Sequence, residues 1–381
     1  MKQKDFFRSL PINGSHSPRH PSVSQALHID VPLLSALLLL SAYGLIVLYS
    51  ASSAQFHVIE RQMTFLGIGF VVMIGAAQIP PIIYKRYAPF FYVLGLVLLI
   101  TVLWKGIGAK GAQRWLALPG LPRFQPSEIM KLAVPIMAAQ YFSKRMMPAN
   151  AKSLIGVFVI LMMPTLLIAK QPDLGTSLLI LSSGVFVIFL AGISWRLILA
   201  GTGLAIAAAP ALWFNMHDYQ KQRVLTFLSP ERDPLGAGWN IIQSKTAIGS
   251  GGTSGKGWLQ GTQSHLDFLP ESSTDFIIAV LAEEFGLVGA AVLLALYFFI
   301  VARGLMISLQ AQDTFSRLLS GSITLTFFVY VFVNIGMVSG LLPVVGVPLP
   351  LVSVGGTSIV TLMAGFGILM SIQTHRRWLS H

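Results

Sequence analysis

The sequence contains no cysteine and very little charge, and both shortages narrow what the protein does. Without cysteine the chain has no disulfide, no iron–sulfur cluster and no thiol nucleophile. Only 10% of its residues are charged, against about 25% in a typical soluble domain. The eight histidines are scattered without the spacing of metal ligands. The composition therefore excludes an ordinary soluble protein and argues against a dedicated zinc site.

Apolar residues take the place of the missing charge and make up 54% of the chain. A helix that crosses a membrane needs about 20 mostly apolar residues, and ten stretches approach that length. They lie near 31–50, 62–81, 88–104, 128–143, 153–169, 174–193, 196–214, 276–302, 318–339 and 356–374. Since lipid permits only helices or closed barrels, the expected fold is an all-α polytopic membrane protein with about ten transmembrane helices.

The first residues are polar, and nothing in them resembles a cleaved signal peptide. We expect a tail over 1–30, followed by one ten-helix membrane domain over 31–381 without internal repeats. With ten helices, one side collects fourteen loop lysines and arginines and the other has six in its short loops. This bias places both termini in the cytoplasm. The net charge of +12, on so apolar a chain, indicates anionic lipid and not nucleic acid as its counterpart.

The unusual sequence gathers in the loops expected on the outer face. A long loop of about 215–275, between the seventh and eighth helices, is dense in glycine and charge, and residues 340–356 are rich in proline and glycine. Loops of such length are typically functional or linkers. Because Trp239 and Phe268 stand among the glycines of the long loop, the functional interpretation is favoured.

Several long motifs then resemble one family in the right order. They are Gly238-Trp-Asn-Ile-Ile-Gln-Ser-Lys, Gly255-Lys-Gly-Trp, Phe268-Leu-Pro-Glu-Ser-Ser-Thr-Asp-Phe, Arg114-Trp, Gln125-Pro-Ser-Glu, Gln171-Pro-Asp-Leu-Gly-Thr-Ser and Pro348-Leu-Pro-Leu-Val-Ser. The chain from about residue 30 onward resembles the SEDS family (shape, elongation, division and sporulation), and within it the RodA branch. One departure is Val354-Gly-Gly-Thr, where the family usually has an aromatic residue before the glycines and Ser after them.

The resemblance implies an inverting glycosyltransferase in the bacterial cytoplasmic (inner) membrane, working on its outer face during cell elongation. The implied substrate is lipid II, polymerised into glycan strands with release of undecaprenyl diphosphate. The implied partners are a class B penicillin-binding protein, which is the transpeptidase, and other proteins of the elongation complex. The septal division branch of the same family is the close alternative.

The reaction requires a base near the attacking hydroxyl and positive charge near the departing diphosphate. Asp275, where the long loop meets the eighth helix, is the candidate base; its position alone equally suits a helix cap, and the resemblance favours the catalytic role. Glu271 either joins Asp275 in holding a divalent cation, Mg²⁺ or Mn²⁺, or shapes the loop. Glu283 and Glu284 lie deeper, either as functional acids or paired with a neighbouring helix.

The candidate substrate-binding groups on the outer face share positive charge or an aromatic ring, and they are Arg114, Trp115, Lys131, Arg223, Lys245 and Lys256. Arg114 is the strongest, since a guanidinium grips phosphate with two bonds while the adjacent indole covers a sugar or anchors at the interface. Lys131 either contacts the diphosphate or forms a buried ion pair with Glu128, three residues earlier. We favour Glu128 as structural support.

Two further motifs have simpler interpretations. Asp173 precedes a helix and suits its N-cap, so it is expected to support the structure. The glycine-rich run 249–257 is not a nucleotide-binding loop, because Ser250 and Gly257 stand where that motif needs Gly and Ser or Thr. A lipid II flippase and a scaffold for the transpeptidase remain alternatives to the enzyme, but inverted repeats are absent and the polar motifs gather on one face, as catalysis there requires.

Overall fold

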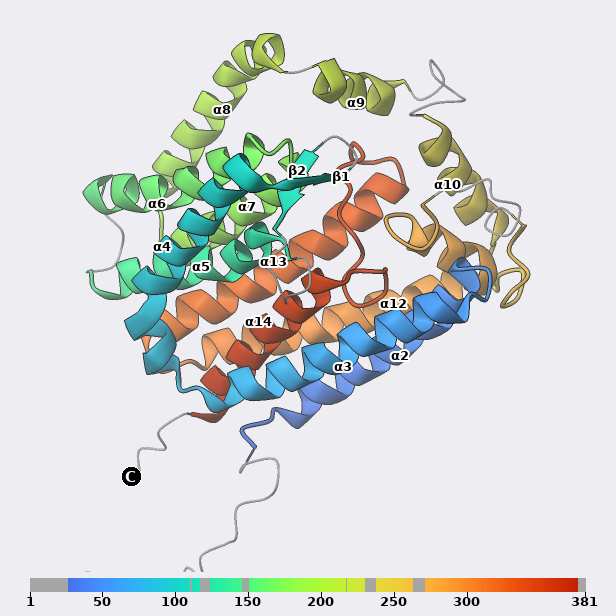
Figure 1. Ribbon diagram of the computed structural model, residues 1–381, viewed down its shortest axis with the longest axis horizontal. Coiled ribbons are helices and arrows are strands. Elements are labelled where there is room, and N and C mark those ends of the chain that lie inside the picture. The colour runs from blue at the N-terminus through green and yellow to red at the C-terminus, as the bar shows by residue number, and fades with distance from the viewer. Residues whose placement is uncertain are drawn as a thin grey trace, which may run out of the picture.

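The structure is a computed structural model that describes residues 27–109, 112–116, 124–145, 151–216, 218–229, 238–262 and 271–375. Over these residues the chain forms twelve helices and one hairpin (Figure 1). The helices are α2 (Val31–Ala51), α3 (Phe56–Gln78), α4 (Pro81–Lys105), α5 (Pro126–Ser143), α6 (Ala151–Ala169), α7 (Leu174–Leu190), α8 (Trp195–Asn215), α9 (Asp218–Leu228), α10 (Trp239–Ser250), α12 (Ile277–Leu309), α13 (Thr314–Val338) and α14 (Thr357–Thr374). The strands β1 (Ile107–Ala109) and β2 (Ala112–Trp115) pair antiparallel.

The all-helical polytopic fold expected from the sequence is confirmed, and each of the ten apolar stretches coincides with a helix. Six helices are long and apolar enough to cross a membrane, namely α2, α3, α4, α12, α13 and α14. Shorter apolar helices cover Ser153–Ala169, Leu174–Leu190 and Trp195–Ala208. Large apolar side chains remain exposed on the outward faces, for example Phe90 at 62% and Phe298 at 75%. Lipid is the environment that such faces require.

Aspartates begin three of these helices where the sequence changes from polar to apolar. The carboxylates of Asp30, Asp173 and Asp313 accept from main-chain N–H groups in the first turns of α2, α7 and α13, at 3.0, 3.3 and 3.1 Å. Each carboxylate satisfies an N–H group that has no partner within the helix. The cap role expected of Asp173 is therefore present in the structure.

Most of the helices form one bundle, and both described ends of the chain lie at the same end of it (Figure 1). α12 packs against α13 and α2, α13 against α5 and α7, and α14 against α3. At the common end, the ring of His28, just before α2, stacks on that of His375, just after α14, with 4.0 Å between centroids. Burial lowers the pKa of His375, which favours the neutral form of this ring.

The structure differs from expectation in two of the connections between helices. The segment of about 215–275 contains two helices, α9 and α10, although its glycines and charges suggested a loop. The connection after α4 contains the β1–β2 hairpin, for which the sequence carried no strand signal. Within the described residues α8 and α9 make few contacts with other helices, and Figure 1 shows them arching away from the bundle.

The glycine-rich run closes a break in α12. At Gly286 the backbone leaves helical geometry, with φ 63° and ψ −159°, which interrupts the normal ladder of hydrogen bonds. The segment 252–257 replaces the lost bonds. Lys256 N and Gly257 N donate to the carbonyls of Glu283 and Glu284, and Leu287 N and Val288 N donate to those of Gly252 and Thr253, at 3.0–3.1 Å. This close approach of two main chains explains why the run is rich in glycine. The sequence alone had indicated only that the run is not a nucleotide-binding loop.

We expect Gly255→Ala to destabilise the protein strongly. Gly255 has φ +80°, and an added Cβ would overlap the carbonyl of Glu284, a main-chain group that cannot move aside. Thermal unfolding in detergent measures the loss, which should reach about 2 kcal/mol or more, as for other strained core sites. Gly252→Ala is the control for φ alone, since it has φ +57° with open space, and Gly249→Ala is the control for composition, since its helical site is open. Equal melting temperatures for Gly249→Ala and Gly255→Ala would contradict the close main-chain contact between residues 252–257 and the break in α12.

Candidate active site

A cavity of about 230 Å³ opens among α5, α7, α13 and α14. Its rim comes from β2 and the starts of α5 and α7, and one wall comes from the proline- and glycine-rich segment 346–358. Charged and polar side chains line the part of the cavity near the rim. Its base is apolar and consists of Leu132, Pro135, Ile323, Leu362 and Phe366. Five residues singled out from the sequence as substrate-binding or supporting line it, namely Arg114, Trp115, Glu128, Lys131 and Asp173.

Arg114 and Trp115 occupy the rim. The Nη2 atom of Arg114 donates to the Pro172 carbonyl at 2.6 Å, and its Nε lies 3.7 Å from Oδ2 of Asp173. The same Asp173 oxygen accepts from Nε2 of Gln125 at 3.1 Å. The arginine is thus held at the cavity entrance by the turn before α7, and its side chain remains 35% exposed. A cation so placed attracts an anionic group that enters the cavity.

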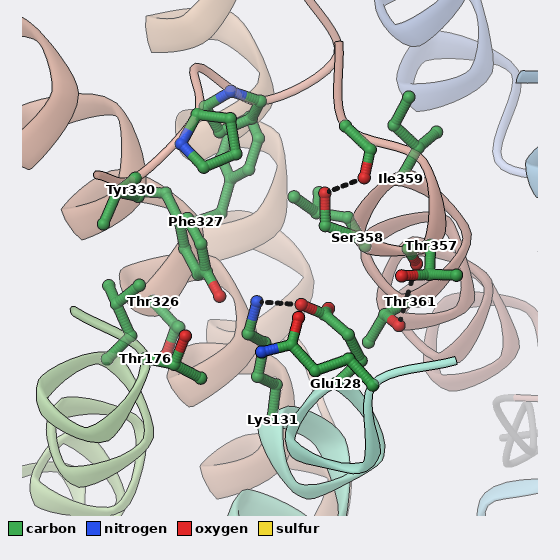
Figure 2. A pocket seen from close by; sticks show the side chains of 18 of the residues that line it. Glu128, Lys131, Thr176, Thr326, Phe327, Tyr330, Thr357, Ser358, Ile359 and Thr361 are labelled. Atoms are coloured by element: carbon green, nitrogen blue, oxygen red, sulfur yellow. Dashed lines mark hydrogen bonds and ion pairs between the residues drawn. The ribbon is translucent and has the colours of Figure 1, made fainter. Parts of the chain in front are cut away.

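Glu128 and Lys131 form the ion pair that their spacing suggested, inside the cavity (Figure 2). Lys131 Nζ donates to Glu128 Oε1 at 2.7 Å, and the two side chains are 13% and 9% exposed. The same ammonium lies 5.2 Å from the centre of the Tyr330 ring. The other carboxylate oxygen of Glu128 is buried and has no hydrogen-bond partner among the described residues. The pair therefore supports the wall and still offers an acceptor to a bound molecule.

Asp275 lies at the edge of this cavity. Its carboxylate oxygen Oδ2 would be 3.5 Å from a Cβ placed on Gly346, a residue of the cavity wall. The N-cap position of α12 is assigned to Phe276, the residue after Asp275. Glu271, in the same turn, accepts from the Thr274 hydroxyl at 2.8 Å and thereby shapes the loop.

Two further basic candidates, Lys245 and Lys256, are not among the residues that line the cavity. Lys245 is exposed on α10 and extends over Gly340, just after α13. Lys256 pairs with the fully buried Glu283 at 2.7 Å and so joins the glycine segment to α12. The side chain of Arg223 lies outside the described residues, as does Phe268. The deeper Glu284 accepts a hydrogen bond from the Ser50 hydroxyl of α2, so both acids of α12 are bonded within the protein.

A cation held at the turn of residues 271–275 would rest on few groups. Within the described ranges no cluster of three His, Asp or Glu residues is suited to hold a metal ion. Mg²⁺ is commonly held by one or two carboxylates together with substrate phosphates. Glu271 and Asp275 fit that pattern, with the phosphates supplied by the substrate.

Sequence reasoning missed the polar groups that α13 contributes. Thr326 and Tyr330 line the cavity beside Lys131 (Figure 2), and the Thr326 hydroxyl is buried with no partner among the described residues. Asn334, one turn further along, bonds the main chain at Asp275. Their only signal in the sequence is polarity at intervals of three or four residues in an apolar stretch, which predicts one polar helix face.

Comparison with known proteins now decides the family. A family model described as "Cell cycle protein" (FtsW, RodA and SpoVE) matches residues 31–378. The chain belongs to the SEDS family. Among curated SEDS relatives, "Peptidoglycan glycosyltransferase MrdB" of Escherichia coli K12 is 55% identical over 96% of this chain and 98% of its own. A "Probable peptidoglycan glycosyltransferase FtsW" of Trichlorobacter lovleyi is 37% identical over 90% and 92%.

Solved structures of this SEDS fold agree with the helix arrangement. One, described as "Structural coordination of polymerization and crosslinking by a peptidoglycan synthase complex", superposes with a TM-score of 0.80 at 31% identity, covering 90% of this chain and 97% of that one. The Rod shape determining protein RodA of Thermus thermophilus superposes with a TM-score of 0.69 at 27% identity, covering 90% and 96%. The chain is therefore a multi-pass membrane protein with the RodA-like arrangement of helices.

Proposed function

We infer that this protein is a peptidoglycan glycosyltransferase of the RodA type, which polymerises lipid II during cell elongation. The observation that carries the inference is a single cavity whose rim and walls bring Arg114, the Glu128–Lys131 pair and, at its edge, Asp275 together. The family supplies the reaction class, and the cavity supplies the groups that the reaction needs. The higher identity to MrdB than to FtsW supports the elongation type over the septal one.

The chemistry assigns a role to each group. A sugar hydroxyl attacks the anomeric carbon of the donor, a new glycosidic bond forms, and the bond to the diphosphate breaks with inversion. The Asp275 carboxylate accepts the hydroxyl proton as the general base. Undecaprenyl diphosphate leaves with the bonding electrons, and its developing charge is stabilised by Arg114 at the rim, with Trp115 against the sugar.

The wider arrangement follows from this role. The ten apolar helices each cross the inner membrane, both termini and the tail 1–30 face the cytoplasm, and the cavity opens outward. The stacked His28 and His375 support a common side for the two ends. A class B penicillin-binding protein cross-links the strands that emerge, together with other elongation proteins. The relative solved within a peptidoglycan synthase complex supports such a partnership.

Polymerisation of lipid II by the purified protein tests the function. We expect glycan polymer from the protein together with its transpeptidase, and less from the protein alone. The flippase alternative has its own assay, translocation of fluorescent lipid II across vesicles. Translocation without polymer, with the transpeptidase present, would replace the glycosyltransferase assignment. Neither activity, with complex formation intact, would support the scaffold.

Arg114→Ala should weaken the use of lipid II more than it weakens binding to the transpeptidase. Since Arg114 is assigned both to the bound phosphate and to the developing charge, loss of this charge-assisted contact is expected to raise KM about tenfold or more and to lower kcat as well. Titration of lipid II measures KM, and co-purification measures partner binding. Arg114→Lys keeps the charge but loses the two-pronged guanidinium contact, so its KM should lie between that of the wild type and that of Arg114→Ala. An unchanged KM in Arg114→Ala would leave the arginine with only its contacts to Pro172 and Asp173.

A further inference from the structure

Asn334 is a polar side chain sealed inside the apolar bundle. It lies on α13, one turn before that helix ends, and none of it is exposed. An amide buried in this way is costly unless its groups are hydrogen-bonded. Asn334 lies beside the turn of residues 271–275, inside the bundle, and this position calls for a specific role.

The amide nitrogen of Asn334 bridges two separate segments. Nδ2 donates to the main-chain carbonyl of Asp275 at 2.9 Å and to that of Val347 at 2.7 Å. Val347 and its neighbour Gly346 belong to the cavity wall. One side chain therefore fixes the candidate base to the wall that it faces.

Two neighbouring bonds complete the attachment. The hydroxyl of Ser353 donates to the Thr274 carbonyl and accepts from Leu349 N. The main-chain N–H of Val354 donates to the Ser273 carbonyl at 3.1 Å. Three successive carbonyls, at residues 273, 274 and 275, are thus each bonded, and all three bonds involve the wall segment or Asn334. The turn cannot shift along the wall without breaking several of them.

We propose that Asn334 is a positioning residue for the glycosyl transfer, which holds the Asp275 main chain so that the carboxylate stays beside Gly346 at the cavity edge. The proposal rests on the proposed function, in which Asp275 is the base. Asn334 does not line the cavity; it acts by fixing the Asp275 main chain relative to Val347 of the wall. It therefore sets the rate of the chemical step and not the affinity for lipid II.

The test compares Asn334→Leu, of similar volume but without donors, with Ser322→Ala. Ser322 is an equally buried polar residue of α13, and its hydroxyl donates to the Ser183 carbonyl, far from the turn of residues 271–275. For folded, monodisperse Asn334→Leu we expect kcat to fall about 10- to 100-fold, as small misplacements of reacting groups do, with KM for lipid II nearly unchanged. Ser322→Ala should lower the melting temperature without this selective loss of kcat.

A double-mutant cycle with Asp275→Glu separates positioning from general damage. If Asn334 acts through Asp275, the double variant should have a kcat no lower than that of the poorer single variant, because the carboxylate is already displaced. If the fold-loss of kcat in the double variant equals the product of the fold-losses in the two single variants, the proposal is overturned. A folded Asn334→Leu protein with wild-type kcat would overturn it as well.

Ser353→Ala provides a second, milder variant should Asn334→Leu not fold. It removes the bonds of the hydroxyl to Thr274 and Leu349 and should lower kcat to a smaller degree; since Ser353 lines the cavity, kcat alone is compared, and a normal kcat would count against the proposal. Asp275→Asn distinguishes the two levels of inference. Activity in Asp275→Asn would remove the base itself, whereas an inactive Asp275→Asn with a normal Asn334→Leu would remove only the positioning role.

Discussion

Replacement of Asp275 by Asn should abolish polymerisation while the protein stays folded and bound to its transpeptidase. The two side chains have nearly the same size, so packing beside Gly346 is kept. Asn cannot accept the hydroxyl proton, and the loss of a general base lowers rates by about 10²- to 10⁴-fold. The measurement is gel analysis of glycan strands made from lipid II, with complex formation followed by co-purification.

This substitution also separates the two roles that the sequence allowed. Asn caps helices about as well as Asp, so a structural aspartate would tolerate the change and polymer would persist. Glu271→Gln is the matched control, since Glu271 stands in the same turn and accepts from Thr274. Its activity should stay close to wild type. A loss equal to that of Asp275→Asn, restored by raised Mg²⁺ or Mn²⁺, would instead show a cation held by both carboxylates.

The second large effect is expected at the ion pair inside the cavity. Glu128→Gln and Lys131→Met each leave one buried charge without its partner, which costs about 3–5 kcal/mol. The double substitution removes both charges and should recover much of the melting temperature. Losses that simply add in the double variant would contradict a coupled pair.

Activity of the double variant then identifies what Lys131 does. If the pair only supports the cavity, the restored fold should restore polymerisation as well. If Lys131 also contacts the diphosphate, the double variant should be stable but inactive, because no cation replaces the ammonium. Thermal unfolding and polymerisation assays on the same preparation give both answers.

The sequence predicted the helices well because lipid imposes a simple requirement. Every main-chain group in the hydrocarbon must be bonded within its own segment, so long apolar runs such as Leu318–Val338 had to become helices. It predicted the Glu128–Lys131 pair because both partners lie on one helix face. These features depend on residues that are neighbours in the chain or repeat with the helical period.

The remaining features depend on contacts between distant segments. No local pattern indicated that Asn334 would bond both Asp275 and Val347, or that Lys256 would pair with Glu283. The break at Gly286 was hidden because the glycine lies within an apolar stretch that otherwise continues as helix. The hairpin before α5 and the helices α9 and α10 occur in polar, glycine-containing sequence, where the apolar period that marks a membrane helix is missing.

The break at Gly286 changes how α12 fits a bilayer. A straight helix of 33 residues would extend about 50 Å at 1.5 Å per residue, well beyond the roughly 30 Å of hydrocarbon. Residues 287–309 alone reach about 34 Å and are sufficient to cross. The first part, 277–285, is then a separate short rod, tethered by main-chain bonds to residues 252–257. Its position is thus held by those bonds and by the core in which it is buried, and the span 287–309 is the part that adapts to local membrane thickness by tilting.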